Sequence, residues 1–296
     1  MEIVKGRAEK TASSVLNKNP KKQSRIKDGR IFIYISLIVG SVFMIFPFIW
    51  SILTSFMTLS ESLQFPPTIF PNSWKLTNYT DVWNALPFGS FFINTGIMII
   101  VRVVFSVLFS AMAGYAFARI KIRGMNLLFL IVLLPMMVPS QIFILPQYLL
   151  MSKLGLTNTV TALIIPGIAS TFGTFLMRQF FMSVPEEIEE AAILDGCNYG
   201  KMFIKVMLPL AKVPMISVAI FTALFAWKDL MWPLIINMSP DKMPLSSGLA
   251  LLQGQFTTNY PQLMAGSIIA TVPMLILYFI FQKQFIQGIA STGSKE

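Results

Sequence analysis

Long apolar runs constrain the fold of this chain more than any other feature of its sequence. Residues 31–55 form the clearest of them, with 25 residues in a row and no charged side chain. About 20 predominantly apolar residues are enough for a helix to cross the hydrocarbon core of a bilayer, and backbone polar groups in hydrocarbon must be paired within the segment. The chain is 55% hydrophobic and 12% charged, which is about half the charged fraction of a typical soluble domain. We therefore predict an all-α, polytopic integral membrane protein.

The apolar runs predict six transmembrane helices. They are separated by a polar stretch, which has Trp74 and Trp83 suited to a membrane interface, and by shorter loops. Three prolines lie inside the third run, at positions 135, 139 and 146, so we expect that span to be kinked or broken. The expected spans are 31–55, 90–117, 124–146, 158–180, 209–236 and 263–282, with the polar stretch at 56–88, loops at 147–157 and 237–262, and a short polar tail after the last span.

Residues 1–30 differ from the rest of the chain. They hold nine Lys or Arg and three acidic residues and show no amphipathic period. The segment is too long and too basic for a simple signal peptide, and the apolar run after it is too long for the hydrophobic region of one. We predict a mobile, basic cytoplasmic tail over 1–30, followed by one transmembrane domain over 31–296.

The basic residues also predict the orientation of the six-span arrangement. With both termini inside, sixteen of the 23 Lys and Arg lie on cytoplasmic segments: nine in the tail, three at 119–123, and Lys201, Lys205, Lys283 and Lys295. Only Lys75, Lys153 and Lys242 lie outside, and four more lie in spans or at their ends. Such an excess is what the positive-inside rule requires. The net charge of +10 is therefore explained by topology, and we expect no nucleic-acid partner.

The polar segment 183–209 between the fourth and fifth apolar runs reads as two short helices around a turn. Ser183 with Glu186 three residues later is the pattern of a capping box. Gly196 provides a backbone that can end the first helix, and Asn198 can cap the second. Negative charge at a helix start is favourable, and four acidic residues gather there: Glu186, Glu187, Glu189 and Glu190.

At this segment the chain resembles a known family. Glu190-Ala191-Ala192, Asp195-Gly196 and Leu208-Pro209 match the cytoplasmic EAA loop of the permease subunits of bacterial ABC importers. The resemblance implies that the first short helix is a coupling helix, which docks on the cytoplasmic ATPase. The residues that it assigns to ATPase coupling are Glu187, Glu190, Ala191, Ala192, Asp195 and Gly196.

The resemblance extends from about residue 85 to the C-terminus and is closest to the carbohydrate branch. Phe225 to Leu234 is similar to the fifth-span motif of that branch, in which Asn is usual at the position of Lys228. The overall pattern resembles the smaller, six-span permease subunit of the maltose-importer type. It implies a bacterial plasma membrane protein that pairs with a second permease subunit and two ATPase subunits. An extracellular solute-binding protein would deliver a saccharide, ATP and Mg would be bound by the ATPase subunits, and this chain would carry no cofactor.

The residue inventory gives little support to other classes of function. The chain has no His and a single cysteine, Cys197, so a metal cluster and an internal disulfide are not expected. An intramembrane enzyme would need catalytic groups at membrane depth, and no such set is present. An ion-coupled secondary transporter of small solutes remains an alternative. It would need carboxylates in its spans, and Asp229 alone is a poor basis for that coupling.

Four residues within the spans are candidates for the substrate path. Arg102 near the middle of the second span costs about 2.5–3.5 kcal/mol to insert, which indicates either a polar cavity or a structural ion pair. Lys228 and Asp229 are successive helical residues and need not pair with each other. Trp227 can stack on sugar rings. The same reading is open for Trp232, for which we favour a place in the aromatic belt.

Small residues in the second span predict how the helices pack, and charged residues in the spans predict the charge of the substrate. Ala111, Ala113 and Gly114 in the second span predict close helix packing. If Arg102 and Lys228 both face the path, they would stabilise a carboxylate, which favours an acidic saccharide over a neutral one. Asp229 leaves a second interpretation open, in which it neutralises one of these cations and the group is structural.

The charge distribution makes a direct topological prediction. Single cysteines at positions 80 and 155, in a Cys197→Ser background, should react from outside intact cells with a membrane-impermeant thiol reagent. A cysteine at position 15 should not react. Labelling at position 15 from outside would overturn the orientation and would remove segment 183–209 from the ATPase side.

Overall fold

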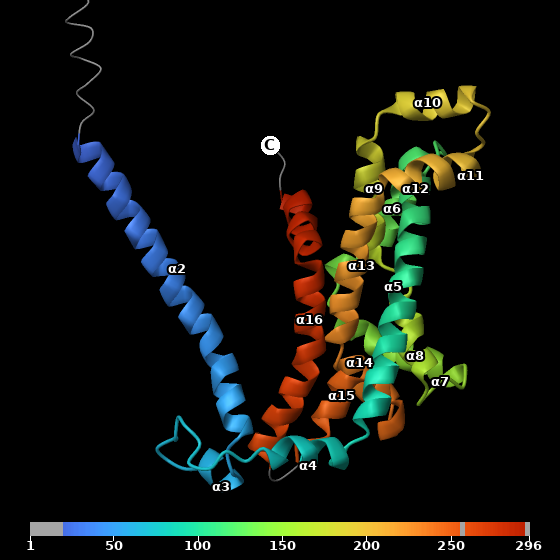
Figure 1. Cartoon of the computed structure of the whole chain (residues 1–296). Coiled ribbons are helices and arrows are strands. Elements are labelled where there is room, and N and C mark those ends of the chain that lie inside the picture. Colours follow the sequence, from blue (N-terminus) through green and yellow to red (C-terminus); the bar gives the residue numbers. More distant parts are fainter. Residues whose placement is uncertain (1–19, 255–257, 294–296) are drawn as a thin grey trace, which may run out of the picture. The chain divides into compact units, whose positions relative to one another are not determined.

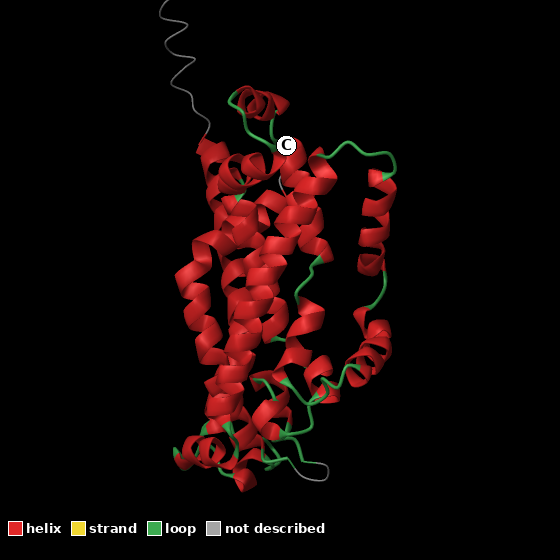
Figure 2. Ribbon diagram, turned by 90° about the vertical axis from the view of Figure 1, so that its right-hand side faces the viewer, coloured by secondary structure: helices red, strands yellow, loops and turns green. Residues whose placement is uncertain are grey.

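The computed structural model describes residues 20–254 and 258–293. Within these ranges the regular structure is entirely helical (Figure 2). The chain divides into two compact units, residues 1–53 and 54–296. Each is described by itself below.

The described part of the first unit is one long helix, α2 (Pro20–Ser55), which continues into the first residues of the second unit. Its part Ile31–Ser55 is long and apolar enough to cross a membrane, and its large apolar side chains are exposed. This agrees with the predicted first span. The helix begins at Pro20, so it includes residues 20–30, which we assigned to the cytoplasmic tail. Residues 1–19 lie outside the described part, and the division of the chain at residue 30 stays a prediction.

The second unit contains three further helical segments of membrane-spanning length and two bent pairs. These three segments are Phe88–Arg119, Val160–Ser183 and Tyr260–Lys283. Each bent pair passes the same test only as a whole, so the described chain has four candidate spans, or up to six if each bent pair is one span. This range is compatible with the predicted six. The last helix, α16 (Tyr260–Gly293), continues beyond the expected end of the sixth span and includes the predicted polar tail as far as Gly293.

The third predicted span is broken, as its prolines indicated. Its two halves meet at an angle of 100° at Val138–Pro139. The predicted loop at 147–157 is wrong over most of its length, because helix α7 runs through it to Lys153. Pro146 is the third residue of α7, where proline is tolerated because the first backbone N–H groups have no partner within the helix. The elements of this region are α6 (Met125–Leu133), η1 (Leu134–Met137), η2 (Ser140–Phe143) and α7 (Ile144–Lys153).

The fifth predicted span is interrupted as well. Helix α13 (Lys212–Trp227) ends before Lys228, and α14 (Met231–Ile236) starts three residues later. Pro233 explains the gap, because proline lacks the N–H that would bind the carbonyl four residues earlier and its ring clashes with that group. That carbonyl belongs to Asp229, and it accepts a hydrogen bond from the Ser246 hydroxyl instead, at 2.5 Å. The short helix α12 (Leu208–Leu210) precedes α13, and α15 (Leu245–Ala250) carries Ser246.

The centre of the second unit is α5 (Phe88–Arg119), which packs against α9 (Thr171–Ser183) and α13 (Figure 1). Small residues bring these helices together, as predicted. A Cβ atom on Gly114 would lie 2.5 Å from the Cβ of Met177, and one on Gly173 would lie 2.3 Å from the Ser110 hydroxyl. Ala111 is fully buried in the same contact.

At one end of α5, short helices form a cap over the unit. Asn94 donates to the carbonyls of Asp241 and Met243 at 2.9 and 3.0 Å, and the Thr95 hydroxyl accepts from the backbone of Leu245. These bonds satisfy backbone groups that the short elements leave open. The cap consists of α3 (Leu59–Ser62), α4 (Thr77–Ala85), η5 (Pro240–Lys242) and α15.

At the other end of α5, helix α10 (Glu186–Leu194) lies across the helix bundle (Figure 1). Gly196 has a φ of +78° and ends α10, and the Asn198 side chain caps α11 (Tyr199–Met202), both as predicted. The predicted capping box is wrong. Ser183 is the last residue of α9, and its hydroxyl donates to the carbonyl of Phe180 at 2.7 Å, so it does not cap α10. A π-helical turn, η4 (Phe203–Met207), follows α11.

Candidate functional site

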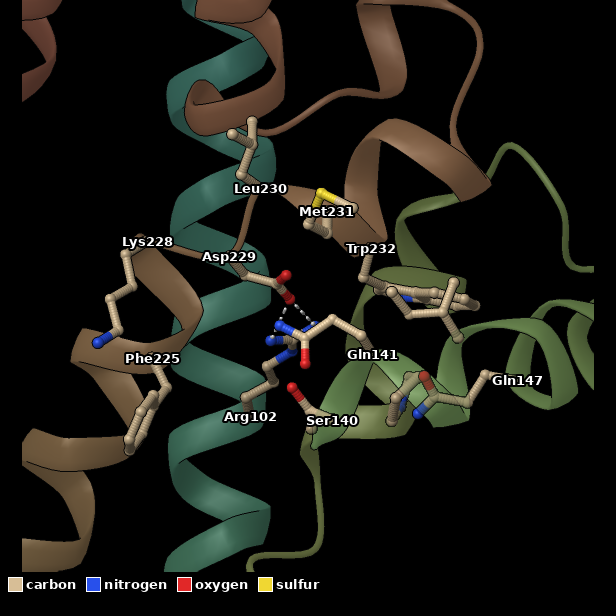
Figure 3. Close-up of a pocket in the computed structure, with 13 residues that line it drawn as sticks. Arg102, Ser140, Gln141, Gln147, Phe225, Lys228, Asp229, Leu230, Met231 and Trp232 are labelled. Carbon is tan, nitrogen blue, oxygen red and sulfur yellow. Dashed lines mark hydrogen bonds and ion pairs between the residues drawn. The ribbon is translucent and has the colours of Figure 1, made fainter. Parts of the chain in front are cut away.

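Arg102 lies in the middle of α5 and is only 6% exposed. Its Nε donates to the carbonyl of Leu163 at 2.9 Å, and a second guanidinium nitrogen, Nη2, donates to the same oxygen. Its Nη1 and Nη2 lie 3.1 and 3.2 Å from the Asp229 Oδ2 (Figure 3). Arg102 therefore forms the buried ion pair that was one of its two interpretations, and the partner is Asp229.

Interruptions in two spans make this arrangement possible. The carbonyl of Leu163 belongs to α8 (Val160–Ile164), which ends in a 3-10 turn, η3 (Ile165–Gly167). Gly167 in that turn has no side chain to obstruct the guanidinium, because a Cβ atom there would lie 2.5 Å from the Cδ and Nε of Arg102. Asp229 lies in the gap between α13 and α14. The arginine thus joins one continuous helix to the breaks in two others.

A pocket of about 540 Å³ opens beside the ion pair. Hydroxyl and amide side chains from the broken third span, Ser140, Gln141 and Gln147, line it together with the charged groups. Its apolar lining includes Phe225 and Trp232. Figure 3 shows Ser140 and Gln141 close to the guanidinium of Arg102. The volume is in the range of small-molecule sites, and a mainly apolar wall with a few polar groups is typical of them.

The predicted path residues do not all meet in this pocket. Arg102, Lys228 and Asp229 line it, whereas Trp227 packs beside the apolar cluster that contains Phe88. The preferred interface position for Trp232 is wrong. Trp232 is 6% exposed, and its Nε1 donates to the carbonyl of Ala162 at 2.9 Å, because α14 packs against α8 and the buried indole needs an acceptor.

Lys228 is separate from the ion pair. Its side chain is exposed, its Nζ lies 4.8 Å from the ring centroid of Phe225, and Figure 3 shows it directed away from Asp229. Because the charges of Arg102 and Asp229 balance, Lys228 supplies the excess positive charge at the pocket. The premise of two uncompensated cations is therefore not met.

Sequence reasoning missed the polar residues of the third span. Pro139 indicated the break, and the polar residues that follow it, Ser140 and Gln141 at once and Gln147 six residues later, were the available signal. Non-helical backbone at membrane depth is tolerated where it lines a cavity. A polar side chain beside such a break is therefore a candidate for the cavity wall.

Helix α10 forms a second candidate site at the far end of α5. Five of the six residues assigned to coupling are exposed, and Ala192 is buried against the bundle. Three large apolar side chains are also exposed here, Ile188 at 36%, Ile193 at 56% and Leu194 at 89%. The helix therefore presents acidic and apolar side chains to the outside, and Ala192 on its inner face packs against the bundle.

An ion pair connects α10 to α5. Arg119 Nε lies 2.9 Å from Glu189 Oε1, and the same guanidinium donates to the carbonyl of Val184. Burial raises the pKa of the Glu189 carboxyl, an effect that the Arg119 charge opposes. Sequence reasoning noted both charges but did not pair them, because 70 residues separate them.

No metal site is found among the described residues. No group of three or more His, Cys, Asp or Glu side chains among them could hold a metal ion. Cys197 is half-buried and unpaired.

Comparison with known protein families accounts for this architecture. The family model described as "binding-protein-dependent transport system inner membrane component" matches residues 106–290, more than half of the chain. The chain belongs to this family. It is accordingly a membrane-embedded transport subunit and not an enzyme, and the resemblance to ABC importer permeases is confirmed.

Individual relatives cover nearly the whole permease. The arabinooligosaccharides transport system permease protein AraQ of Halalkalibacterium halodurans is 38% identical over 254 residues, which cover 85% of this chain and 91% of that protein. The diacetylchitobiose uptake system permease protein NgcG of Streptomyces coelicolor is 32% identical over 262 residues, 87% of this chain and 86% of that protein. A crystal structure of a bacterial ABC transporter involved in the import of the acidic polysaccharide alginate has the same fold. Its chain gives a TM-score of 0.75 at 23% identity and covers 87% of this chain and 96% of its own length.

The buried ion pair of the permease makes a stability prediction. Asp229→Asn should destabilise the purified permease by about 3 kcal/mol, because it leaves the Arg102 charge buried without a counter-charge. The double variant Arg102→Gln with Asp229→Asn should be more stable than this single variant, and Lys228→Gln, at an exposed side chain, should match the wild type. Thermal unfolding in detergent measures all four proteins. Equal melting temperatures for Asp229→Asn and the wild type would contradict the structural role of the pair.

Proposed function

We propose that this permease forms, with a second permease subunit, the translocation path for a saccharide or oligosaccharide. Two cytoplasmic ATPase subunits would drive import, and an extracellular solute-binding protein would deliver the substrate. The observation that carries the proposal is the polar pocket on broken spans beside Arg102. The names of the relatives support the substrate class, since AraQ and NgcG are named for an oligosaccharide and a disaccharide derivative.

The pocket lining suits the chemistry of a sugar. Sugar hydroxyls both donate and accept hydrogen bonds, and the Gln141 and Gln147 amides and the Ser140 hydroxyl can do the same. The C–H faces of a sugar ring pack on apolar and aromatic surfaces, which Phe225 and Trp232 supply. In this proposal the Arg102–Asp229 pair holds the frame of the pocket, and Trp227 does not touch the substrate.

Coupling to the ATPase is assigned to the outer face of α10. Exposed acidic groups at Glu187, Glu190 and Asp195 and apolar groups at Ile193 and Leu194 offer a mixed surface for a partner groove. Ala191 and Gly196 are exposed and would allow the groove to approach the helix backbone, whereas Ala192 packs against the bundle. ATP and Mg would bind to the ATPase subunits, and this chain would contribute no cofactor. The permease would lie in the plasma membrane with both termini in the cytoplasm.

The structure gives less support than the sequence to an ion-coupled secondary transporter. Asp229 was the carboxylate on which ion coupling would have depended, and it is engaged by Arg102. A carboxylate that is held by a guanidinium has no free charge for a coupling ion. The ATP-driven mechanism needs no such group in the spans.

The pocket proposal is tested by removing two amides. Gln141→Leu with Gln147→Leu should lower saccharide uptake by the reconstituted importer about tenfold, because two hydrogen bonds of about 0.7 kcal/mol each are lost. Gln64→Leu, at an exposed loop residue outside the pocket, is the matched control and should transport normally. Radiolabelled uptake into proteoliposomes is the measurement, with assembly checked by size exclusion. Wild-type uptake by the assembled double variant would place the sugar elsewhere.

A second candidate concerns the charge of the substrate. Lys228 leaves the pocket with an excess positive charge, which would favour an acidic saccharide. Lys228→Asn should then reduce uptake of a uronic-acid-containing oligosaccharide at least about fivefold, the equivalent of roughly 1 kcal/mol for a screened charge pair. Uptake of a neutral oligosaccharide of the same length should not change. Efficient transport by the wild type of the neutral sugar alone would refute the acidic substrate.

A further inference from the structure

Helix α5 connects the two candidate sites without a break. It runs for 32 residues from Phe88 to Arg119, and it carries Arg102 at the pocket and Arg119 at α10. The two arginines are 17 residues apart, which corresponds to about 25 Å along a helix. The third and fifth predicted spans and the α8–α9 segment, by contrast, are interrupted. α5 is therefore the rigid connection between the pocket and the coupling helix.

Arg119 holds α10 at two points. Its Nε lies 2.9 Å from the Glu189 carboxylate, and its guanidinium also donates to the carbonyl of Val184, the residue between α9 and the start of α10. The side chains of Arg119 and Glu189 are 7% and 16% exposed. A charge pair with so little solvent around it is weakly screened. Its two atoms are in ion-pair contact without the geometry of a hydrogen bond.

The remaining attachments of α10 are slight by comparison. Val184 and Pro185 alone connect it to α9, and the Gly196 turn leads out of it. Ala192 supplies the buried apolar contact of the helix. A second ion pair, Lys121 with Glu186 at 3.4 Å, has both side chains more than 60% exposed, and such pairs contribute little.

We propose that the Arg119–Glu189 ion pair is the positioning contact through which movement of α10 is carried into α5 and from there to the pocket at Arg102. This inference rests on the proposed function, in which α10 docks on the ATPase. The desolvation of two buried charges offsets much of their attraction, so a buried ion pair is weak evidence for stability, and we assign this pair a positioning role. Without it, α10 can rotate about Ala192 and its two short connections while the ATPase moves.

Charge exchange tests the proposal in the complete importer. The variants are Arg119→Glu, Glu189→Arg and the exchange of both, with the milder Glu189→Gln as a single variant that retains the shape of the side chain. The measurements are saccharide transported per ATP hydrolysed, co-purification of the ATPase subunits, and basal ATP hydrolysis. The matched controls are Lys121→Glu and Glu186→Lys, which reverse the neighbouring exposed pair.

Each single variant at Arg119 or Glu189 should bind the ATPase and hydrolyse ATP at the basal rate. The ratio of transport to hydrolysis should fall about tenfold, the equivalent of roughly 1.4 kcal/mol of coupling between contacting residues. The double exchange should restore the ratio to within about twofold of the wild type. The controls should change it by less than that.

Three results would overturn the inference. The first is a normal ratio of transport to hydrolysis in Glu189→Gln and the other assembled single variants. The second is a double exchange that assembles but does not recover this ratio. The third is loss of ATPase binding in the single variants, since the pair would then serve docking. Failure of the proposed function is distinguishable from all three. It would appear in the wild type, as absence of ATP-dependent saccharide uptake.

Discussion

The guanidinium of Arg102 is the group on which the interior of the second unit depends. An arginine at membrane depth is tolerated only with partners, and interrupted helices at membrane depth leave backbone groups that also need partners. The structure meets both requirements with one set of contacts. Arg102 binds the carbonyl of Leu163 at the end of α8 and the carboxylate of Asp229 in the gap after α13. Gly167 lets it approach the turn that follows α8.

This arrangement also explains why a pocket lies there. Where helices are interrupted, side chains and turns replace a regular packing surface, and the broken third span adds Ser140, Gln141 and Gln147 to the wall. The result is a polar surface inside an otherwise apolar unit. Such a surface can receive hydroxyl groups, and this links the fold of the permease to the proposed saccharide path.

Much of the fold was predictable because it follows from local rules. The length of the apolar runs predicted the spans, the prolines predicted the break at Pro139, and Gly196 and Asn198 predicted the turn after α10. The errors arise where a residue has a choice of partners. Ser183 bonds to its own helix rather than capping α10, and Trp232 finds a buried acceptor on α8 rather than a membrane interface. Pro146 lies in the first turn of a helix rather than at the end of one.

The candidate sites were predictable in part for the same reason. Arg102, Lys228 and Asp229 stood out as charges in apolar runs, and the outer face of α10 stood out through its motif. The pairing of Arg102 with Asp229 and of Arg119 with Glu189 joins residues 127 and 70 positions apart. Such pairs depend on how helices pack, which local patterns do not specify. The separation of Trp227 from the pocket also depends on helix packing, because the rotation of α13 about its axis determines which of its side chains face the cavity.

ATP-driven transport of a saccharide is the function that we propose for this permease. The most direct test is uptake of a labelled oligosaccharide into proteoliposomes that contain both permease subunits and the solute-binding protein. The experiment compares vesicles with and without the ATPase subunits while the same ion gradient is present. We predict uptake only in vesicles that hold the ATPase together with ATP and Mg. Equal, gradient-dependent uptake in vesicles without the ATPase would contradict the account.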